Sequence, residues 1–559
     1  MLTRRLRFIS IGAAIVGSVW RARRRGEATT YGSAQWADEQ VLRAAGLLDG
    51  KGVVLGMTPE GHYIRHDGPE HVKVVAPTRS GKGVGIVIPT LLTWPGSVLV
   101  YDIKGENWQV TAGYRQQFCH CIYFNPTDNQ SAHFNPLLEV RRGDLEVRDV
   151  QNIADMIVDP DGRGLADHWA KTGHALLVAT ILHVLYAQAD KTLRGVANFL
   201  SNPTQPFINT LGVMMTARHS EAGTHPVVAA AAREMLNKSD NERSGVLSTA
   251  MSFLSLYRDP IVAANTADSD FRIVDLMQSD KPLSLYLVIP PSDTNRLRPL
   301  IRLMLNQICR RLTEELNPTH NLQRLLLLID EFPALGRLDF FESSLAFIAG
   351  YGIKALLISQ TTNQLEKFYG ATHTILDNTH VRVFYAPNTE RTAETLSKML
   401  GTKTEIHQQK NYAGHRLAPW LGHVMVADQE TARPLLTPGE VMALPASDEI
   451  LFLAGKQPIL AKKIHYYKDV NFTARVLPPP PLRAARPYPY RPKPHPPAWP
   501  YVSEPCASPT GLSAEETLFT EAAGTMADSE LAEREPMTEL EHAGDDEPQH
   551  SSPNRDFAL

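Results

Sequence analysis

The stretch VKVVAPTRSGKGVGIVIPT, residues 72–90, decides the fold. A short β-branched run breaks into a loop of Pro, Gly, Ser and Lys and then into an apolar helix, the layout of a phosphate-binding loop. Such a loop cradles a polyphosphate with backbone N–H groups, so it needs glycines and a helix N-terminus that faces the anion. We expect Lys82 to place its charge on the β- and γ-phosphates. The loop residues are Thr78, Arg79, Ser80, Gly81, Lys82 and Gly83.

The loop matches the pattern G-x-x-x-x-G-K-[ST] only in part. Ala76 stands at the first Gly, and Gly83 replaces the Ser or Thr that ordinarily binds Mg²⁺. Taken alone, the stretch is equally compatible with a polar Gly turn between a strand and a helix.

A second motif favours the nucleotide interpretation. Residues 324–331 read RLLLLIDE, an apolar run that ends in two carboxylates, as expected of a buried parallel strand that carries acids to the edge of a sheet. In this Walker B arrangement Asp330 would hold Mg²⁺ and Glu331 would polarise the attacking water as general base. The alternative is a buried strand followed by a solvated turn.

Composition is compatible with a large ATPase. The chain has 559 residues with 43% hydrophobic content, enough for substantial cores. Its four cysteines are too few and too badly spaced for a disulfide framework or a four-ligand zinc site, and Cys119-His120-Cys121 is interpreted as ordinary strand sequence. A reducing cytosol fits this cysteine usage best.

The charge is distributed unevenly along the chain. Residues 513–559 contain 13 Asp and Glu against 2 Lys and Arg, which leaves about +7 on the rest of a chain of net charge −4. A mildly basic body can meet a polyanion. Before this acidic stretch, residues 478–500 contain 11 prolines and are predicted to form an extended linker. We therefore expect the folded part to end near Leu477 and residues 478–559 to form a disordered tail.

One uncharged apolar stretch lies near the N-terminus. It spans Phe8 to Trp20, with arginines on both sides. Thirteen residues rise only about 20 Å as a helix, short of the ~30 Å hydrocarbon core. A secretory signal, a tilted anchor and the remnant of a longer membrane region are the alternatives, and the signal is disfavoured because a secreted ATPase lacks its substrate. The basic flanks favour attachment to an anionic leaflet.

About 240 residues separate the two motifs, far more than a minimal core needs. Residues 148–264 carry helical periodicity and are predicted to form an inserted all-α domain. Strand patterns resume with FRIVDLM (271–277) and PLSLYLVIP (282–290) and continue through KALLISQ (354–360) and HVRVFYAP (380–387), separated by helical patterns. This alternation predicts an α/β fold with a parallel doubly wound sheet.

Together these motifs resemble the TraG-type coupling proteins of conjugative type IV secretion. The resemblance covers roughly residues 30–465 and includes APTRSGKGVGIVIPT, FNPL (134–137), DHWAKTGHALL (167–177), LLLLIDEFPALGRL and RVFYAPNTERTAETLS. In that family the loop commonly reads SGKG, so Gly83 is a family variant. The resemblance implies a membrane-attached, hexameric, RecA-like P-loop ATPase that uses ATP and Mg²⁺.

Partners and location also follow from the resemblance. It implies a protein on the cytoplasmic face of the bacterial inner membrane that takes the relaxase with its single-stranded DNA from the relaxosome to the secretion channel. Double-stranded DNA is a further expected partner. The expected organisation is a membrane-proximal segment (1–30), a nucleotide-binding domain in two parts (31–147 and 265–477), the all-α domain (148–264) and the tail (478–559).

Further site residues are assigned by motif. Gln360 matches the position from which RecA-like motors sense the γ-phosphate, although a polar cap on a buried strand is its alternative. A hexameric ATPase also needs a cation from the neighbouring subunit, because charge builds on the γ-phosphate. Arg382 and Arg391 are the candidates, with a surface ion pair as the alternative. Asp102 and Lys104 border either the nucleotide or an interface.

Two other classes of protein remain open from the sequence. A double-stranded DNA translocase of the chromosome-segregation type would share both motifs, but it is expected to carry a winged-helix module after the motor. A non-hydrolysing secretion adaptor would use the fold only for binding, which the retained Lys82, Asp330 and Glu331 disfavour. The family's usual pair of transmembrane helices is matched here only by the 13-residue apolar stretch.

Overall fold

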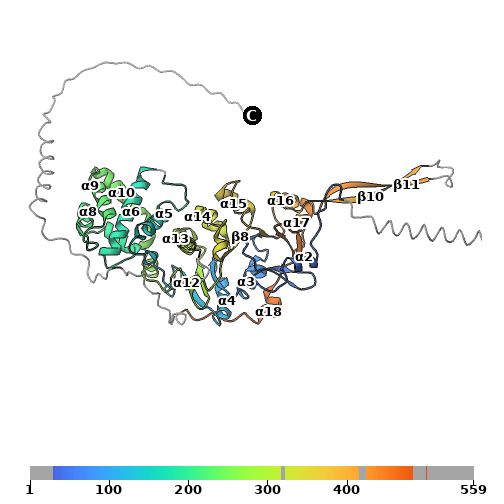
Figure 1. Cartoon of the computed structure of the whole chain (residues 1–559), viewed down its shortest axis with the longest axis horizontal. Helices are drawn as coiled ribbons and strands as arrows, with labels where there is room; N and C mark the ends of the chain where they lie inside the picture. Colours follow the sequence, from blue (N-terminus) through green and yellow to red (C-terminus); the bar gives the residue numbers. More distant parts are fainter. Residues whose placement is uncertain (1–28, 166, 317–320, 414–422, 483–498, 500–559) are drawn as a thin grey trace, which may run out of the picture. The chain divides into compact units, whose positions relative to one another are not determined.

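The computed structural model describes residues 29–165, 167–316, 321–413, 423–482 and 499 (Figure 1). The apolar stretch Phe8 to Trp20, the acidic tail and most of the Pro-rich run lie outside the described residues, so the expectations about them remain predictions.

One large sheet organises the described residues. Its eleven strands there lie in the order β2-β1-β13-β12-β9-β3-β8-β7-β4-β6-β5. The strands are β1 (Val53–Met57), β2 (Tyr63–His66), β3 (Val72–Val75), β4 (Ser97–Asp102), β5 (His120–Phe124), β6 (Leu283–Val288), β7 (Leu325–Ile329), β8 (Ile353–Ser359), β9 (Val381–Phe384), β12 (Asp448–Leu453) and β13 (Ile459–Lys462).

The strands from β9 to β5 in this order run parallel. Every residue of β3, β4, β6, β7 and β8 is buried, because helices cover both faces of a parallel sheet. The predicted parallel doubly wound sheet is therefore confirmed. Cys119 and Cys121 are free and buried at β5, in agreement with their interpretation as strand sequence.

An antiparallel extension continues the sheet beyond β9. Strand β12 pairs antiparallel with β9, and β13 joins β12 to β1. This extension was not predicted from the sequence, and it brings the chain after residue 447 beside the central strands.

The helices that accompany the sheet differ in length. They are α2 (Glu39–Ala44), α3 (Ile88–Leu91), α4 (Glu106–Arg115), α12 (Asp275–Gln278), α13 (Thr294–Leu312), α14 (Asp339–Ser344), α15 (Thr362–Tyr369), α16 (Glu390–Leu400), α17 (Pro438–Met442) and α18 (Val470–Thr473). Helix α13 is one of the helical patterns expected between the strands, and its apolar face is buried.

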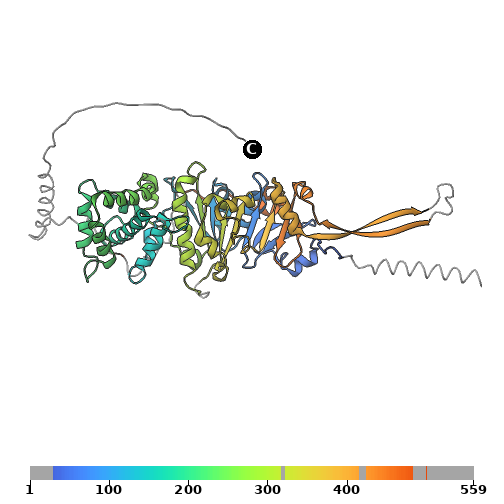
Figure 2. The same cartoon turned by 90° about the horizontal axis from the view of Figure 1, so that it is seen from above.

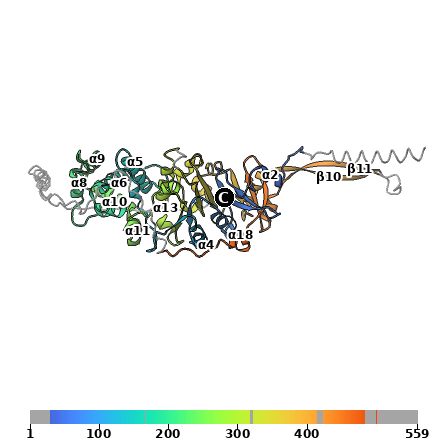
Figure 3. The ribbon, with the colours of Figure 1, turned by 60° about the horizontal axis from the view of Figure 1, so that its bottom comes forward.

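Between β5 and β6 the chain forms a group of helices. They are α5 (Glu146–Val158), α6 (His168–Ala187), α7 (Leu193–Leu200), α8 (Phe207–Thr216), α9 (Pro226–Leu236), α10 (Asp240–Phe253) and α11 (Pro260–Asn265). Helix α6 packs against α5, α9 and α10, and α8 packs against α9 (Figure 3). Among the described helices α6 alone is long and apolar enough to cross a membrane, but it is mostly buried and forms the core of this group.

The predicted strand FRIVDLM is wrong. The segment forms a turn followed by α12. The backbone N–H of Arg272 donates to Asp275 Oδ2 at 2.6 Å, and that of Ile273 donates to Glu139 Oε1 at 3.2 Å. Side-chain carboxylates thus take the donors that a strand would have offered to its neighbour. A buried ion pair between Arg272 and Glu139, at 2.9 Å, fixes the turn.

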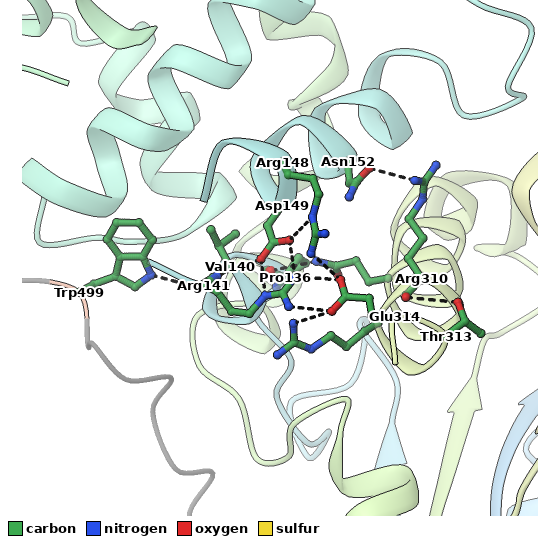
Figure 4. A network of polar contacts seen from close by, with 12 residues as sticks. Pro136, Val140, Arg141, Arg148, Asp149, Asn152, Arg310, Thr313, Glu314 and Trp499 are labelled. Carbon is green, nitrogen blue, oxygen red and sulfur yellow. Dashed lines mark hydrogen bonds and ion pairs between the residues drawn. The ribbon is translucent and has the colours of Figure 1, made fainter. Parts of the chain in front are cut away.

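A polar network joins α5 to the C-terminal end of α13 (Figure 4). The guanidinium of Arg141 donates to Asp149 Oδ1 at 2.7 Å and to both oxygens of Glu314 at 2.7 and 2.8 Å. Arg148 and Arg311 also contact Glu314, at 2.8 and 3.3 Å. The Glu314 carboxylate is therefore the common acceptor of three arginines.

Removing this acceptor should destabilise the protein. We expect Glu314→Ala to lower the free energy of unfolding by about 1 kcal/mol, since it removes the acceptor that three arginines share, while Arg141 keeps its contact with Asp149. Thermal or denaturant unfolding measures the change. Glu315→Ala, which removes a neighbouring exposed glutamate, is the matched control and should change little. Equal loss in both variants would show that the network adds no stability.

A long hairpin was not predicted. Strands β10 (Thr402–Ala413) and β11 (His423–Pro434) pair antiparallel along their whole length (Figure 2). Lys403 also bridges to Ser33, and the backbone N–H of Tyr31 donates to Thr404 Oγ1 at 2.9 Å. The start of the described chain is therefore attached to the base of this hairpin.

Candidate functional site

The sheet order brings the two sequence motifs together. Strand β8 lies between β3, which precedes the phosphate-binding loop, and β7, which precedes Asp330 and Glu331. The three strands run parallel, so their C-terminal ends meet at one edge. Gln360 follows β8 at the same edge. About 250 residues of chain separate groups that share this site.

The loop backbone has the shape that anion binding requires. Arg79 and Gly81 adopt positive φ angles of 61° and 93°, so the chain curls tightly. The Ser80 hydroxyl donates to the Pro77 carbonyl at 2.6 Å, which holds the curl. The helix after Lys82 begins with one widened turn, Gly83–Val87, and continues as α3. Its N-terminus therefore follows the loop directly.

Lys82 contacts both carboxylates of the second motif. Its Nζ lies 3.1 Å from Asp330 Oδ1 and 3.2 Å from Glu331 Oε2. Burial alone would lower the pKa of Lys82, but the two carboxylates outweigh burial and raise it above its ordinary value. Lys82 is thus a positively charged side chain that two ion pairs fix beside the loop.

Glu331 lies at the centre of a hydrogen-bond network. Gln360 Nε2 donates to Glu331 Oε2 at 3.0 Å, and Gln364 Nε2 donates to the other carboxylate oxygen at 3.4 Å. The Thr78 hydroxyl donates to Gln360 Oε1 at 2.7 Å. Glu331 itself has a φ of 63°, a costly conformation for a residue with a side chain. The amide of Gln360 thus connects the loop to the candidate base.

Asp102 and Lys104 differ in position. Asp102 is buried, and its carboxylate accepts the backbone N–H groups of Trp108 at 3.0 Å and Lys104 at 3.3 Å. It therefore holds the turn into α4. Burial raises the pKa of Asp102 to about 6, and Asp330 adds to the shift. The side chain of Lys104 is exposed.

The two candidate arginines also lie in different places. Arg382 is opposite Lys73 in the β9–β3 register, away from the loop end of β3, and donates to the carbonyls of Thr379 and Leu376 at 3.0 and 2.6 Å. The structure does not bring it to the site. Arg391 is exposed in the first turn of α16 and pairs with Glu366 at 2.7 Å.

A cavity of about 130 Å³ adjoins the loop. Thr78 and Gln360 line it together with residues that sequence reasoning missed: Thr361, Tyr385, Asn388 and Thr389. Gln364 was missed as well, although the sequence TTNQ after a strand is a capping signal that the structure confirms. Thr361 precedes α15, and Tyr385, Asn388 and Thr389, to which the sequence assigned no role at the site, follow β9 within the segment RVFYAPNTERTAETLS.

The described residues hold no cluster of three or more metal-ligating side chains. Mg²⁺ in nucleotide sites ordinarily takes one or two carboxylates together with phosphate oxygens and water. Asp330 Oδ1 accepts no hydrogen bond apart from its contact with Lys82. The residues present therefore fit a magnesium ion that arrives with a nucleotide.

Comparisons with known proteins agree with this geometry. The family profile described as Type IV secretory system Conjugative DNA transfer matches residues 35–486. Conjugal transfer protein TraG of Escherichia coli is 45% identical, with 82% of this chain and 80% of that protein covered.

Solved structures of the plasmid coupling protein TrwB share the fold. The complex with the non-hydrolysable ATP analogue ADPNP has a TM-score of 0.57 at 20% identity, covering 79% of this chain and 97% of TrwB. The complex with ADP and Mg²⁺ has a TM-score of 0.55 at 19% identity, covering 77% and 94%. The RecA-like fold expected from the sequence is thereby confirmed. On the family match and the identity to TraG, the chain belongs to the conjugative DNA transfer proteins of type IV secretion systems.

Proposed function

We propose that this protein is an ATP-hydrolysing coupling protein. It links the relaxosome, that is the relaxase with its attached single-stranded DNA, to a type IV secretion channel. The observation that carries the proposal is the contact of Lys82 with Asp330 and Glu331 at the shared edge of β3 and β7. Binding of ADPNP and of ADP with Mg²⁺ by TrwB supports ATP and Mg²⁺ as its ligands.

Each residue has a distinct role in this proposal. The backbone of Thr78 to Gly83 and the charge of Lys82 hold the β- and γ-phosphates. Asp330 would hold Mg²⁺, which neutralises charge on the phosphates when bound. Glu331 takes a proton from the attacking water. In the structure Lys82 occupies both carboxylates, so its charge must shift to the phosphates before Glu331 can act.

Gln360 is suited to report the state of the γ-phosphate. It contacts Thr78 on the loop side and Glu331 on the catalytic side. An amide that bridges both groups can exchange one contact for a phosphate oxygen or for water. We therefore propose that Gln360 coordinates the loop with the base.

Arg391 is our proposed trans-acting arginine. It is exposed on α16 near the cavity beside the loop, whereas the guanidinium of Arg382 is committed to backbone carbonyls. We expect Arg391→Ala to keep ATP affinity and to lose turnover, because the charge acts on a neighbour's transition state. Mixing it with Lys82→Ala subunits should restore part of the turnover if hexamers form. Unchanged turnover in Arg391→Ala alone would contradict this assignment.

The remaining partners and the domain organisation are also proposed. We infer a homo-hexamer at the cytoplasmic face of the inner membrane, with the Phe8 to Trp20 stretch toward the bilayer and the 31–147, 148–264 and 265–477 regions as its domains. The match to conjugative transfer proteins over residues 35–486 favours this function over a chromosome-segregation translocase and over a non-hydrolysing adaptor.

A mating assay tests the proposed function. A donor strain that lacks its own coupling protein should transfer plasmid when it receives the wild-type gene, and not when it receives Glu331→Gln. Both proteins should be present at equal levels by immunoblot. Equal transfer with both genes would show that hydrolysis is not needed.

The tail is expected to be dispensable for hydrolysis. Leu482 packs against the apolar cluster that includes Trp108 and Ala112, and Trp499 Nε1 donates to the Val140 carbonyl at 3.3 Å (Figure 4). Truncation after Leu477 should leave basal hydrolysis near normal. If the acidic stretch competes with DNA, truncation should tighten DNA binding at low salt and less so at high salt. Loss of folding on truncation would contradict this expectation.

A further inference from the structure

The segment after β13 lies against the phosphate-binding loop. Lys463 Nζ donates to the Ser80 carbonyl at 3.4 Å, although 383 residues of chain separate them. The same ammonium lies 3.9 Å from the centre of the Tyr385 ring, a cation–π contact. Lys463 has no part in the roles proposed above for Lys82, Asp330 and Glu331.

The contact with Ser80 fixes one peptide of the loop. In a trans peptide the C=O and the following N–H point in opposite directions. When Lys463 holds the Ser80 carbonyl, the N–H of Gly81 must face away from Lys463. Backbone N–H groups at this point of the loop are the donors that cradle phosphate. Lys463 therefore sets the direction of the Gly81 N–H without contacting it.

A buried carboxyl group lies near Lys463. Glu449 on β12 is completely buried, and burial raises the pKa of its carboxyl well above its ordinary value. The Lys463 ammonium is the strongest influence that opposes this rise, and the Tyr385 hydroxyl is a further neighbour of the carboxyl. The antiparallel extension thus places a buried carboxyl group near the lysine, whose direct contacts are with Ser80 and the Tyr385 ring.

Close packing places the same segment against the start of the loop's helix. A Cβ atom on Gly85 would lie 3.0 Å from the Ile464 carbonyl oxygen and 3.0 Å from the Tyr385 hydroxyl. Only a glycine leaves room for this approach without displacing a neighbour. Lys463 and Ile464 therefore contact two successive parts of the phosphate-binding motif.

We propose that Lys463 is a positioning residue for the phosphate-binding loop, acting through the Ser80–Gly81 peptide. The proposal rests on the proposed function, since it assumes that the loop binds a nucleoside triphosphate. It makes the antiparallel strands β12 and β13 part of the nucleotide site. The site then responds to any movement of this extension relative to β3.

The adjacent lysine offers a matched control. Lys462 has the same side chain, is the last residue of β13 and pairs with Asp448 at 2.6 Å, without a contact to the loop. We would measure the affinity of full-length wild type, Lys463→Met, Lys463→Arg and Lys462→Met for ADPNP by calorimetry. The melting temperature of each without nucleotide monitors the fold.

Lys463→Met should bind ADPNP about tenfold more weakly, as expected for one lost charged hydrogen bond. Lys462→Met should stay within about twofold, Lys463→Arg should recover most of the affinity, and the melting temperatures should agree. Gly85→Ala should weaken ADPNP binding in the same way.

Wild-type affinity in Lys463→Met, or equal weakening in Lys462→Met, would overturn the proposal. If Lys463→Met melts early, Lys463→Arg decides: restored stability without restored affinity would also overturn it. Absence of ADPNP binding by the wild type would instead overturn the proposed function.

Discussion

Lys82→Ala is expected to lower ATP turnover by at least ~10²-fold, by analogy with the loss of one transition-state donor. Lys82 is the cation that contacts both carboxylates of the second motif at the mouth of the loop. Its loss removes the positive charge that would contact the phosphates. It also leaves Asp330 and Glu331 without their lysine counterion. Steady-state phosphate release measures the change.

The fold should survive this substitution. Lys82 is half-buried at the sheet edge and does not belong to the apolar cores. Lys456→Ala, at an exposed turn between β12 and β13, is the control for loss of a surface lysine. Wild-type turnover in Lys82→Ala would disprove the phosphate-binding loop, whereas a lower melting temperature without nucleotide would point to a structural role.

Glu331→Gln should bind ATP normally and hydrolyse it about 10²–10⁴-fold more slowly, because the amide keeps the shape of the side chain and loses the base. Asp330→Ala should behave differently. It removes the carboxylate that fits Mg²⁺, so we expect weaker binding of ATP with Mg²⁺ and little change in binding without Mg²⁺.

Binding of a fluorescent ATP analogue, with Mg²⁺ and with EDTA, separates the two roles. The difference between the two conditions should persist in Glu331→Gln and shrink in Asp330→Ala. Identical behaviour of the two variants in this assay would show that the proposed division of labour is wrong.

Local patterns were sufficient to predict the centre of the fold. The runs around Val75, Ile329 and Ser359 are apolar, short and bounded by polar residues, so the sequence predicts buried parallel strands. Gly81-Lys82 and Asp330-Glu331 each follow the end of such a strand, so their side chains are expected at the same edge of the sheet. Asp330, Glu331, Lys82 and Gln360 could be found in this way.

Contacts between distant segments could not be predicted in the same way. FRIVDLM alternates like a strand, yet Glu139 and Asp275 take its backbone donors. The sequence makes Arg382 a candidate for the arginine that acts on a neighbouring subunit. Only the fold shows that its guanidinium donates to backbone carbonyls. Lys463 has no motif at all, and its contact with Ser80 depends on the order of strands in the sheet.

The hairpin was missed for a related reason. Its strand residues, such as Gln408 and Lys410, are polar, and polar alternation carries little strand signal without a buried face. Pairing with the second strand stabilises it instead, and Glu405 of the first strand forms an ion pair with Arg433 of the second at 3.0 Å.

The most direct test of the central claim is phosphate release from purified full-length protein with ATP and Mg²⁺, compared without DNA, with single strands and with duplex. We predict hydrolysis that DNA stimulates and that Lys82→Ala abolishes. Absence of hydrolysis under all three conditions, from protein that is folded and pure, would contradict the claim that this chain is an ATP-driven coupling protein.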